Sequence, residues 1–298
     1  MVHRVSIFPR RAAILGALFA LCVPVISAGA APVTLKVVAA ENFYGNIVSQ
    51  LGGEKVNVTS ILSDPNVDPH EYESSVDDAK AIASADLVIE NSGGYDDWMD
   101  KLLSASTSSR RVLLKGFDIA PIKLPDNEHV WYDVDNVQAI AQTVTDSLKK
   151  LDPADAALFS KNLQSFSESL SKVRQKILQL KAKWNGTPVG LTETIFLYQA
   201  APIGLSVLTP FEFQKAIAEG NDPPADTVVT AESQVKRKKI KVLIYNAQTV
   251  SSVTTKLQDE ARAAGIPVVP VTETMPAAMN YQNWMLSQLT GLERALGK

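Results

Sequence analysis

The sequence has few of the features that mark disulfide scaffolds, nucleic-acid binders and membrane-spanning proteins. It contains one cysteine, Cys22, in 298 residues, and its formal net charge is −3. A single cysteine cannot form a disulfide framework within the chain. The charge lacks the basic excess that binding to nucleic acid requires, so we expect no nucleic-acid partner. Beyond residue 30, no hydrophobic stretch is long enough to cross a bilayer, so we expect no membrane span in the mature protein.

The first 30 residues are typical of a signal peptide. Arg10 and Arg11 precede an apolar run over 12–26, which is short for a membrane span, and Ala28-Gly29-Ala30 provides small residues for cleavage. Leu21 before Cys22 is a poor residue for a lipoprotein signal, so we expect the cysteine to be removed with the leader. The sequence therefore predicts a periplasmic protein with a cleaved signal peptide. Either the general or the twin-arginine export route remains open.

One long helix is predicted over 153–184, and it organises the rest of the chain. Asp152 is suited to be its N-cap, Pro153 suits its first turn, and Asn185-Gly186 ends it. Its length would be about 48 Å at 1.5 Å per residue. Apolar residues follow one another at alternating intervals of four and three positions, so they lie along one face of the helix: Phe159, Leu163, Phe166, Leu170, Val173, Ile177, Leu180 and Trp184. A coiled-coil strand is one interpretation, and a rigid strut across two lobes is the other.

Segments on both sides of this helix alternate between strand and helix patterns. The predicted strands are 34–39, 56–62, 87–89 and 111–114 before the helix, and 189–191, 205–208, 241–245 and 267–271 after it. This alternation predicts an α/β fold with two lobes, each a parallel four-stranded sheet with helices on both faces. We assign the N-terminal lobe to 31–150, the linking helix to 151–186 and the C-terminal lobe to 187–298. Both lobes are long enough to form a good core.

Polar side chains that could bind a metal follow several of the predicted strands. Ligands of open parallel sheets bind beyond the carboxyl ends of the strands. His70 and His129 lie in loops of the first lobe, whereas Glu193, Asn246 and Glu273 directly follow strands of the second. Two neutral imidazoles and two carboxylates balance the charge of a divalent cation. Zn²⁺ would take these four side chains as a tetrahedron, whereas Mn²⁺ would need more oxygens, which bidentate carboxylates supply.

Signatures of enzymes are missing from the sequence. His70-Glu71 is not followed by a second histidine at the zinc-protease spacing, and there is no glycine-rich phosphate loop. A metal held by four side chains also leaves no position for a reacting water. We therefore expect a binding protein rather than an enzyme.

Several motifs resemble those of the periplasmic metal-binding proteins of zinc and manganese ABC importers, the cluster A-I solute-binding proteins. The most specific motif is Asp68-Pro69-His70-Glu71-Tyr72-Glu73, which is followed by Ala85-Asp86-Leu87-Val88. A second motif, His129-Val130-Trp131-Tyr132-Asp133, is similar to the family's His-x-Trp-x-Asp, and Leu151-Asp152-Pro153-Ala154 is similar to the start of its long helix. The resemblance covers essentially the whole mature chain. It implies two lobes bridged by that helix, with a metal buried between them.

The resemblance also implies ligands, a partner and a cargo. It places the four metal ligands at His70, His129, Glu193 and Glu273, although the family usually has aspartate at the last position. Asn246 stands where many members have glutamate, and is expected to contact the ligands rather than the metal. The implied partner is an inner-membrane ABC permease, and we expect a monomer. The implied cargo is Zn²⁺ or Mn²⁺, with Fe²⁺ also possible.

Features of the sequence point to both metals. The histidine-rich acidic loop of many zinc members is absent, and the third ligand is a glutamate, as in manganese members. The segments 272–276 and 281–285 instead resemble a subgroup described as zinc proteins. The alternatives to this function are a binder of an iron chelate, haem or corrinoid on the same fold, a secreted metalloenzyme, and an adhesin or scaffold.

Overall fold

The structure, a computed structural model, describes residues 1–5, 34–64, 67 and 72–298. The chain divides into Met1–Pro32 and Val33–Lys298, and the second unit contains all the secondary structure described below. The predicted signal peptide lies, apart from its first five residues, outside the described residues. Among the described residues, no helix has both the length and the apolar character needed to cross a membrane.

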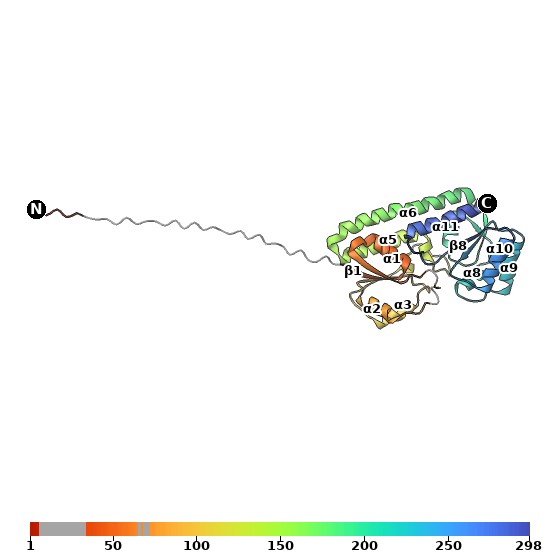
Figure 1. The fold of residues 1–298 in the computed structure, drawn as a ribbon, viewed down its shortest axis with the longest axis horizontal. Helices are drawn as coiled ribbons and strands as arrows, with labels where there is room; N and C mark the ends of the chain where they lie inside the picture. Colours follow the sequence, from red (N-terminus) through yellow and green to blue (C-terminus); the bar gives the residue numbers. More distant parts are fainter. Residues whose placement is uncertain (6–33, 65–66, 68–71) are drawn as a thin grey trace. The chain divides into compact units, whose positions relative to one another are not determined.

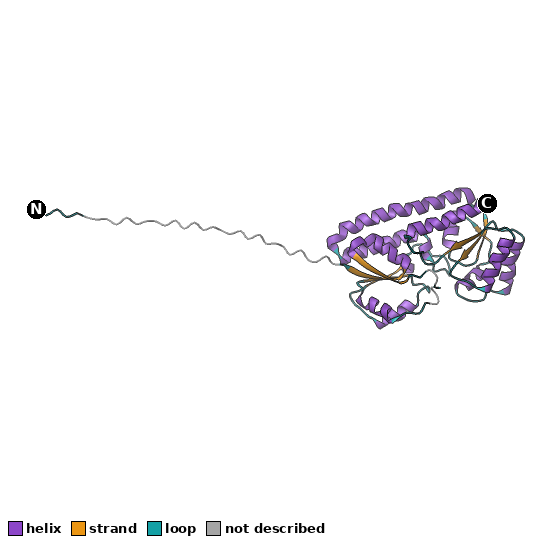
Figure 2. Cartoon of the chain, viewed as in Figure 1, coloured by secondary structure: helices purple, strands orange, loops and turns teal. Residues whose placement is uncertain are grey.

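The first lobe is built on a parallel four-stranded sheet. Its strands are β1 (Leu35–Glu41), β2 (Val56–Leu62), β3 (Leu87–Glu90) and β4 (Val112–Lys115), in the order β2-β1-β3-β4. Its helices are α1 (Asn42–Gly52), α2 (Val76–Ser84), α3 (Trp98–Ala105), α4 (Gly116–Ile119) and α5 (Val134–Leu151), with short 3-10 turns at Gly53–Lys55 and Val130–Tyr132. The parallel arrangement and the helical crossovers confirm the predicted fold class (Figures 1 and 2).

The residues of β1 explain why helices cover both faces of this sheet. Val37 and Ala39 point into the core formed with α1 and α5, whereas Val38 and Ala40 pack with residues of α2 and α3 on the other face. Because both faces are buried, the strand reads as a continuous apolar run, as is usual for parallel sheets. Because β2 and β3 run parallel to β1, the carboxyl ends of all three strands lie at the same edge of the sheet.

The second lobe repeats this topology. Its strands are β5 (Pro188–Leu191), β6 (Ser206–Val207), β7 (Leu243–Asn246) and β8 (Val268–Val271), all parallel, in the order β6-β5-β7-β8. Its helices are α7 (Leu197–Ile203), α8 (Phe211–Ala218), α9 (Ala225–Lys236), α10 (Ser252–Ala263) and α11 (Tyr281–Leu296). Strand β6 is shorter than the predicted 205–208. In each sheet the second strand lies on one side of the first strand, and the third and fourth strands lie on the other side. The position between β1 and β3, like that between β5 and β7, is therefore a topological switch point.

The long helix α6 (Ala156–Trp184) runs along both lobes and packs against α1 and α5 of the first and α7 and α11 of the second (Figure 1). Its 29 residues correspond to about 44 Å. Six of the eight predicted stripe residues are buried, and Leu163 and Trp184 are half-buried. The position of its start differs from the prediction: Pro153–Asp155 forms a 3-10 turn, and the side chain of Asp152 makes no capping hydrogen bond.

The hydrophobic core does not separate into one core for each lobe. A single cluster runs from β1 through α1, α5 and α6 to β5, β7 and α11, and includes Val37, Trp131, Leu170, Leu191 and Trp284. Each lobe has a smaller second cluster under its outer helices. The two lobes therefore share their main core, although each is long enough to form one of its own. Burial of apolar area across the lobes favours a fixed arrangement of the two sheets.

Candidate metal centre

Three of the predicted ligands converge at the ends of strands between the two lobes. Glu193 lies two residues after β5, and Glu273 lies two residues after β8, next to the switch point between β5 and β7. His129 comes from the first lobe, directly before the 3-10 turn at Val130–Tyr132. Among the described residues, these three form the group of histidine, cysteine and acidic side chains whose donor atoms all lie within 4.8 Å of one another.

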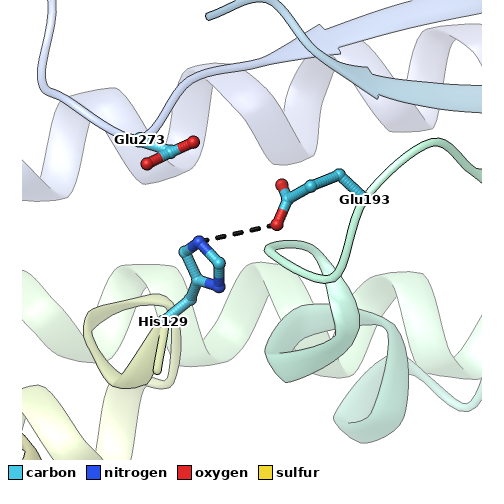
Figure 3. A group of neighbouring side chains, drawn as sticks. All are labelled: His129, Glu193 and Glu273. Atoms are coloured by element: carbon cyan, nitrogen blue, oxygen red, sulfur yellow. Dashed lines mark ion pairs between the residues drawn. The ribbon is translucent and has the colours of Figure 1, made fainter. Parts of the chain in front are cut away.

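The geometry of this group fits a small cation (Figure 3). His129 Nε2 lies 3.5 Å from Glu193 Oε1. Ligands about 2.1 Å from a tetrahedral Zn²⁺ lie roughly 3.4 Å from each other, so this pair already has the spacing of two ligands on one ion. His129 and Glu273 are 0% exposed and Glu193 is 2% exposed. An ion bound here would exchange its water shell for protein atoms.

The imidazole of His129 is oriented by Asn127. Asn127 Oδ1 lies 3.0 Å from His129 Nδ1 and also accepts a hydrogen bond from the His129 backbone N–H. An amide oxygen can only accept, so it selects the tautomer with the proton on Nδ1. This tautomer presents the lone pair of Nε2 toward the two carboxylates. The Asn127 amide nitrogen donates to the Thr194 carbonyl, which ties His129 to the opposite lobe.

The Glu193 carboxylate is held by three donors. Its Oε1 accepts hydrogen bonds from Thr194 Oγ1 and the Ile195 backbone N–H, each 3.0 Å long. Its Oε2 accepts a longer bond of 3.3 Å from the Asn246 side-chain amide. Such partners fix the direction in which a ligand presents its lone pairs.

The Glu273 carboxylate also has donors on both oxygens, and they come from both lobes. Asn246 Nδ2 lies 2.5 Å from Glu273 Oε1, and Thr249 Oγ1 donates to the same oxygen at 3.2 Å. Tyr95, in the first lobe, donates to Oε2 at 2.9 Å. Asn246 therefore contacts both carboxylates, so the position of each depends on the other.

The electrostatics of the group favour a bound cation. Burial, followed by the charge of Glu273, raises the pKa of Glu193 well above its ordinary value. Two buried carboxylates this close repel each other unless one takes a proton or a cation lies between them. A divalent ion would neutralise both charges at once.

A second group of buried carboxyls lies at the switch point of the first lobe. Glu41 ends β1, Glu90 ends β3, and Asp96 follows in the next loop. Asp96 accepts hydrogen bonds from the backbone N–H groups of Asn91 and Ser92. Burial, together with the charge of Asp96, raises the pKa of Glu41 well above its ordinary value. Burial raises the pKa of Glu90 to about 7, although the ammonium of Lys115 lies 3.0 Å from its carboxylate.

The fourth predicted ligand, His70, lies outside the described residues. The structure thus brings His129, Glu193, Glu273 and Asn246 together and gives no position for His70. Sequence reasoning missed Asn127, Tyr95 and Thr249. Thr249 follows β7 and Tyr95 follows β3, so the rule that selected the glutamates could have selected both. A hydroxyl beyond a strand end is common, however, and only the contact with Glu273 distinguishes these two.

The chain is similar in sequence to metal-uptake proteins. A family model described as zinc-uptake complex component A, periplasmic, matches residues 37–295. The manganese-binding lipoprotein MntA of Halalkalibacterium halodurans is 27% identical over 146 residues, which cover 48% of this chain and 48% of that protein. The chain thus aligns with about half the length of the first curated relatives it matches.

Solved structures share the fold. The periplasmic zinc-binding protein TroA from Treponema pallidum superposes with a TM-score of 0.75 at 19% identity, covering 88% of this chain and 99% of that one. The solute-binding protein FpvC from Pseudomonas aeruginosa, in complex with Mn²⁺, has a TM-score of 0.73 at 21% identity, covering 89% and 98%. At this level of identity the likeness establishes the two-lobed architecture with its long connecting helix.

Proposed function

The chain belongs to the periplasmic zinc-uptake complex component A family, and on this premise we propose that it is a solute-binding protein for a divalent transition metal, Zn²⁺ or Mn²⁺. It captures the ion between its two lobes outside the cytoplasm and delivers it to a membrane ABC permease. The observation that carries the proposal is the convergence of buried His129, Glu193 and Glu273 from three distant parts of the chain. The names of TroA and MntA, a zinc-binding and a manganese-binding protein, support this class of cargo.

In this proposal each side chain has a distinct task. His129 contributes Nε2, while Glu193 and Glu273 contribute carboxylate oxygens and balance the charge of the ion. His70 supplies the fourth ligand. Asn246 does not bind the ion but holds both carboxylates through its amide. Because α6 and the shared core span both lobes, capture and release require only small shifts of one lobe against the other.

Two other functions have less support. A binder of an iron chelate, haem or corrinoid needs a wide cleft, whereas the three converging side chains are at most 2% exposed. A metalloenzyme needs an open coordination position for a reacting water, and a set of four protein ligands fills a tetrahedral ion. We therefore propose binding and delivery without catalysis.

We also propose how the chain is divided and how it leaves its leader. Residues 1–30 are a cleaved signal peptide, 31–150 and 187–298 are the two metal-binding lobes, and 151–186 link them. The relative MntA is a lipoprotein. Here the leucine before Cys22 favours a leader removed beyond the cysteine, which would release the mature chain into the periplasm, and we propose that the mature chain is a monomer. The mass of the exported chain distinguishes the two, since a lipid-anchored form would begin at a modified Cys22.

Metal analysis of the purified protein, with melting temperatures in Zn²⁺, Mn²⁺ and Fe²⁺, tests the function. A ligand that binds only the folded state raises the melting temperature with its concentration. His129→Ala and His70→Ala should each abolish most of this increase, and Glu193→Gln, which keeps an amide oxygen at this position, should reduce it. Glu90→Gln, which alters a buried glutamate outside the group, should preserve it. Full metal affinity in the double variant His70→Ala, His129→Ala would show that the ligands are assigned wrongly.

A further inference from the structure

Gln248, in the loop after β7, uses its whole side-chain amide in hydrogen bonds. Its Oε1 accepts from the backbone N–H groups of Glu273 at 2.7 Å and Thr274 at 3.0 Å. Its Nε2 donates to Thr274 Oγ1 at 2.9 Å and to the Val67 carbonyl at 3.0 Å. An amide has two acceptor and two donor positions, so all four are used. The backbone partners also fix the orientation of the amide, since an N–H only donates and a carbonyl only accepts.

Two of these bonds hold the backbone from which the Glu273 side chain projects, and a third holds the hydroxyl of the next residue, Thr274. The Gln248 N–H itself donates to Asn246 Oδ1 at 3.0 Å, and the other end of the Asn246 amide contacts the carboxylate of Glu273. The backbone and the carboxylate of Glu273 are therefore tied to the same short loop through two different side chains. If Gln248 is removed, the backbone at Glu273 can shift while Asn246 still holds the carboxylate.

The fourth bond crosses between the lobes. Val67 belongs to the segment that follows β2 of the first lobe, and it lies three residues before His70 in the sequence. The Gln248 amide thus bonds to the backbone of Glu273, a candidate ligand from the second lobe, and to the backbone of Val67, which precedes the candidate ligand His70 by three positions in the sequence. A shift of the first lobe that breaks the bond to Val67 frees one of the two N–H donors of the amide that positions Glu273.

We propose that Gln248 is a positioning residue that couples the contact between the lobes to the orientation of Glu273 and so sets how long the metal stays bound. The inference rests on the proposed metal-binding function. It assigns Gln248 no direct contact with the metal. Side chains that orient metal ligands are commonly worth about 10- to 100-fold in affinity, and we expect an effect of this size here.

The chain offers a matched control for this proposal. Gln50 in α1 is also half-buried and also bonds across the lobes, from its Nε2 to Gln282 Oε1 at 3.1 Å, but it has no contact with the metal centre in the described residues. Gln248→Met and Gln50→Met remove the same amide and one interlobe hydrogen bond each. The measurements are the Zn²⁺ dissociation rate after chelator addition, the visible spectrum of the Co²⁺-loaded protein and the melting temperature without metal.

We expect Gln248→Met to accelerate Zn²⁺ release about 10- to 100-fold and to change the Co²⁺ spectrum, whereas Gln50→Met leaves both within about twofold of the wild type. Equal acceleration in the two variants would mean that Gln248 only stabilises the lobe contact, and no acceleration in either would also overturn the proposal. If the wild-type protein itself binds no Zn²⁺, Mn²⁺ or Fe²⁺, the proposed function fails and the inference falls with it.

A second variant keeps the test decisive if Gln248→Met does not fold. Gln248→Glu retains an oxygen for the N–H groups of Glu273 and Thr274 but loses both donors, and it places an oxygen opposite the Val67 carbonyl. Its added negative charge would by itself attract a cation more strongly. Faster Zn²⁺ release in Gln248→Glu would therefore support the coupling, while slower release would show that charge, not position, governs this residue.

Discussion

The hydroxyl of Tyr95 in the first lobe donates a 2.9 Å hydrogen bond to Glu273 Oε2 in the second. Both residues are buried, and burial followed by the charge of Glu273 raises the pKa of the Tyr95 phenol well above its ordinary value. The phenol therefore keeps its proton and remains a donor throughout the physiological range. This contact links a candidate metal ligand to the opposite lobe through one side chain.

Tyr95→Phe should weaken metal binding because it removes one of the donors that orient Glu273. We expect a loss of about 10- to 100-fold in Zn²⁺ affinity, measured by competition with a chelating dye. Tyr281→Phe is the control, since the Tyr281 hydroxyl also bonds across the lobes, to the Trp131 carbonyl at 2.6 Å, but does not touch either carboxylate. An equal loss of affinity in both variants would contradict a specific role for Tyr95.

Glu90→Gln should change how the stability of the metal-free protein depends on pH. Burial raises the pKa of Glu90 from 4.5 to about 7, so the folded protein binds this proton more tightly than the unfolded chain does. The resulting stability is complete below pH 4.5 and is lost as the pH rises through 7. Each pKa unit corresponds to about 1.4 kcal/mol, so the effect is measurable by urea unfolding at pH 5 and pH 8. The variant should lose less stability between these values than the wild type.

Glu232→Gln provides a comparison of opposite sign. Hydrogen bonds from Lys236 and Lys256 lower the pKa of Glu232, so its contribution is present at neutral pH and is lost as the pH falls through the lowered value. This substitution should leave the decline between pH 5 and pH 8 unchanged. Parallel stability curves for Glu90→Gln and the wild type would show that Glu90 does not titrate in this range.

Metal binding should weaken in acid and release protons at any pH below the raised pKa of Glu193. Burial and the charge of Glu273 raise the pKa of Glu193, so an incoming cation must displace a proton from this carboxyl while the pH is below that raised value. Affinity should fall about tenfold per pH unit for each proton displaced. Calorimetry in two buffers with different ionisation enthalpies counts the protons. Glu193→Gln should reduce the count, and an unchanged count would assign the proton to another group.

The long helix allows a direct test of its role as a strut. Leu170 is 0% exposed and belongs to the shared core, whereas Leu178 on the same helix is 57% exposed. Leu170→Ala should destabilise the protein by about 2–5 kcal/mol, because it removes packed methyl groups and leaves a cavity. Leu178→Ala should cost less than about 0.5 kcal/mol. Urea unfolding of the two variants, followed by fluorescence, measures the difference, and similar losses would indicate that α6 is not packed as described.

The sequence was sufficient to predict features that depend on local pattern. The spacing of apolar residues from Phe159 to Leu180 identified the long helix, and the alternation of strands and helices identified two parallel sheets. The rule that ligands gather at strand ends selected Glu193 and Glu273. The start of the helix was misplaced because Asp152 and Pro153 fit a cap equally well in an α-helix and in the 3-10 turn that they form here.

Tertiary structure alone decided which of these residues meet. The donors Tyr95, Asn127 and Gln248 have no distinctive pattern around them, and each acquires its role from a contact with a residue at least 25 positions away. The single core shared by the lobes has the same origin, since apolar periodicity reports which face is buried but not against what. The local sequence determines which segments form strands and helices and which face of each is apolar. The packing of the two lobes fixes the distances between side chains, and a metal centre depends on those distances.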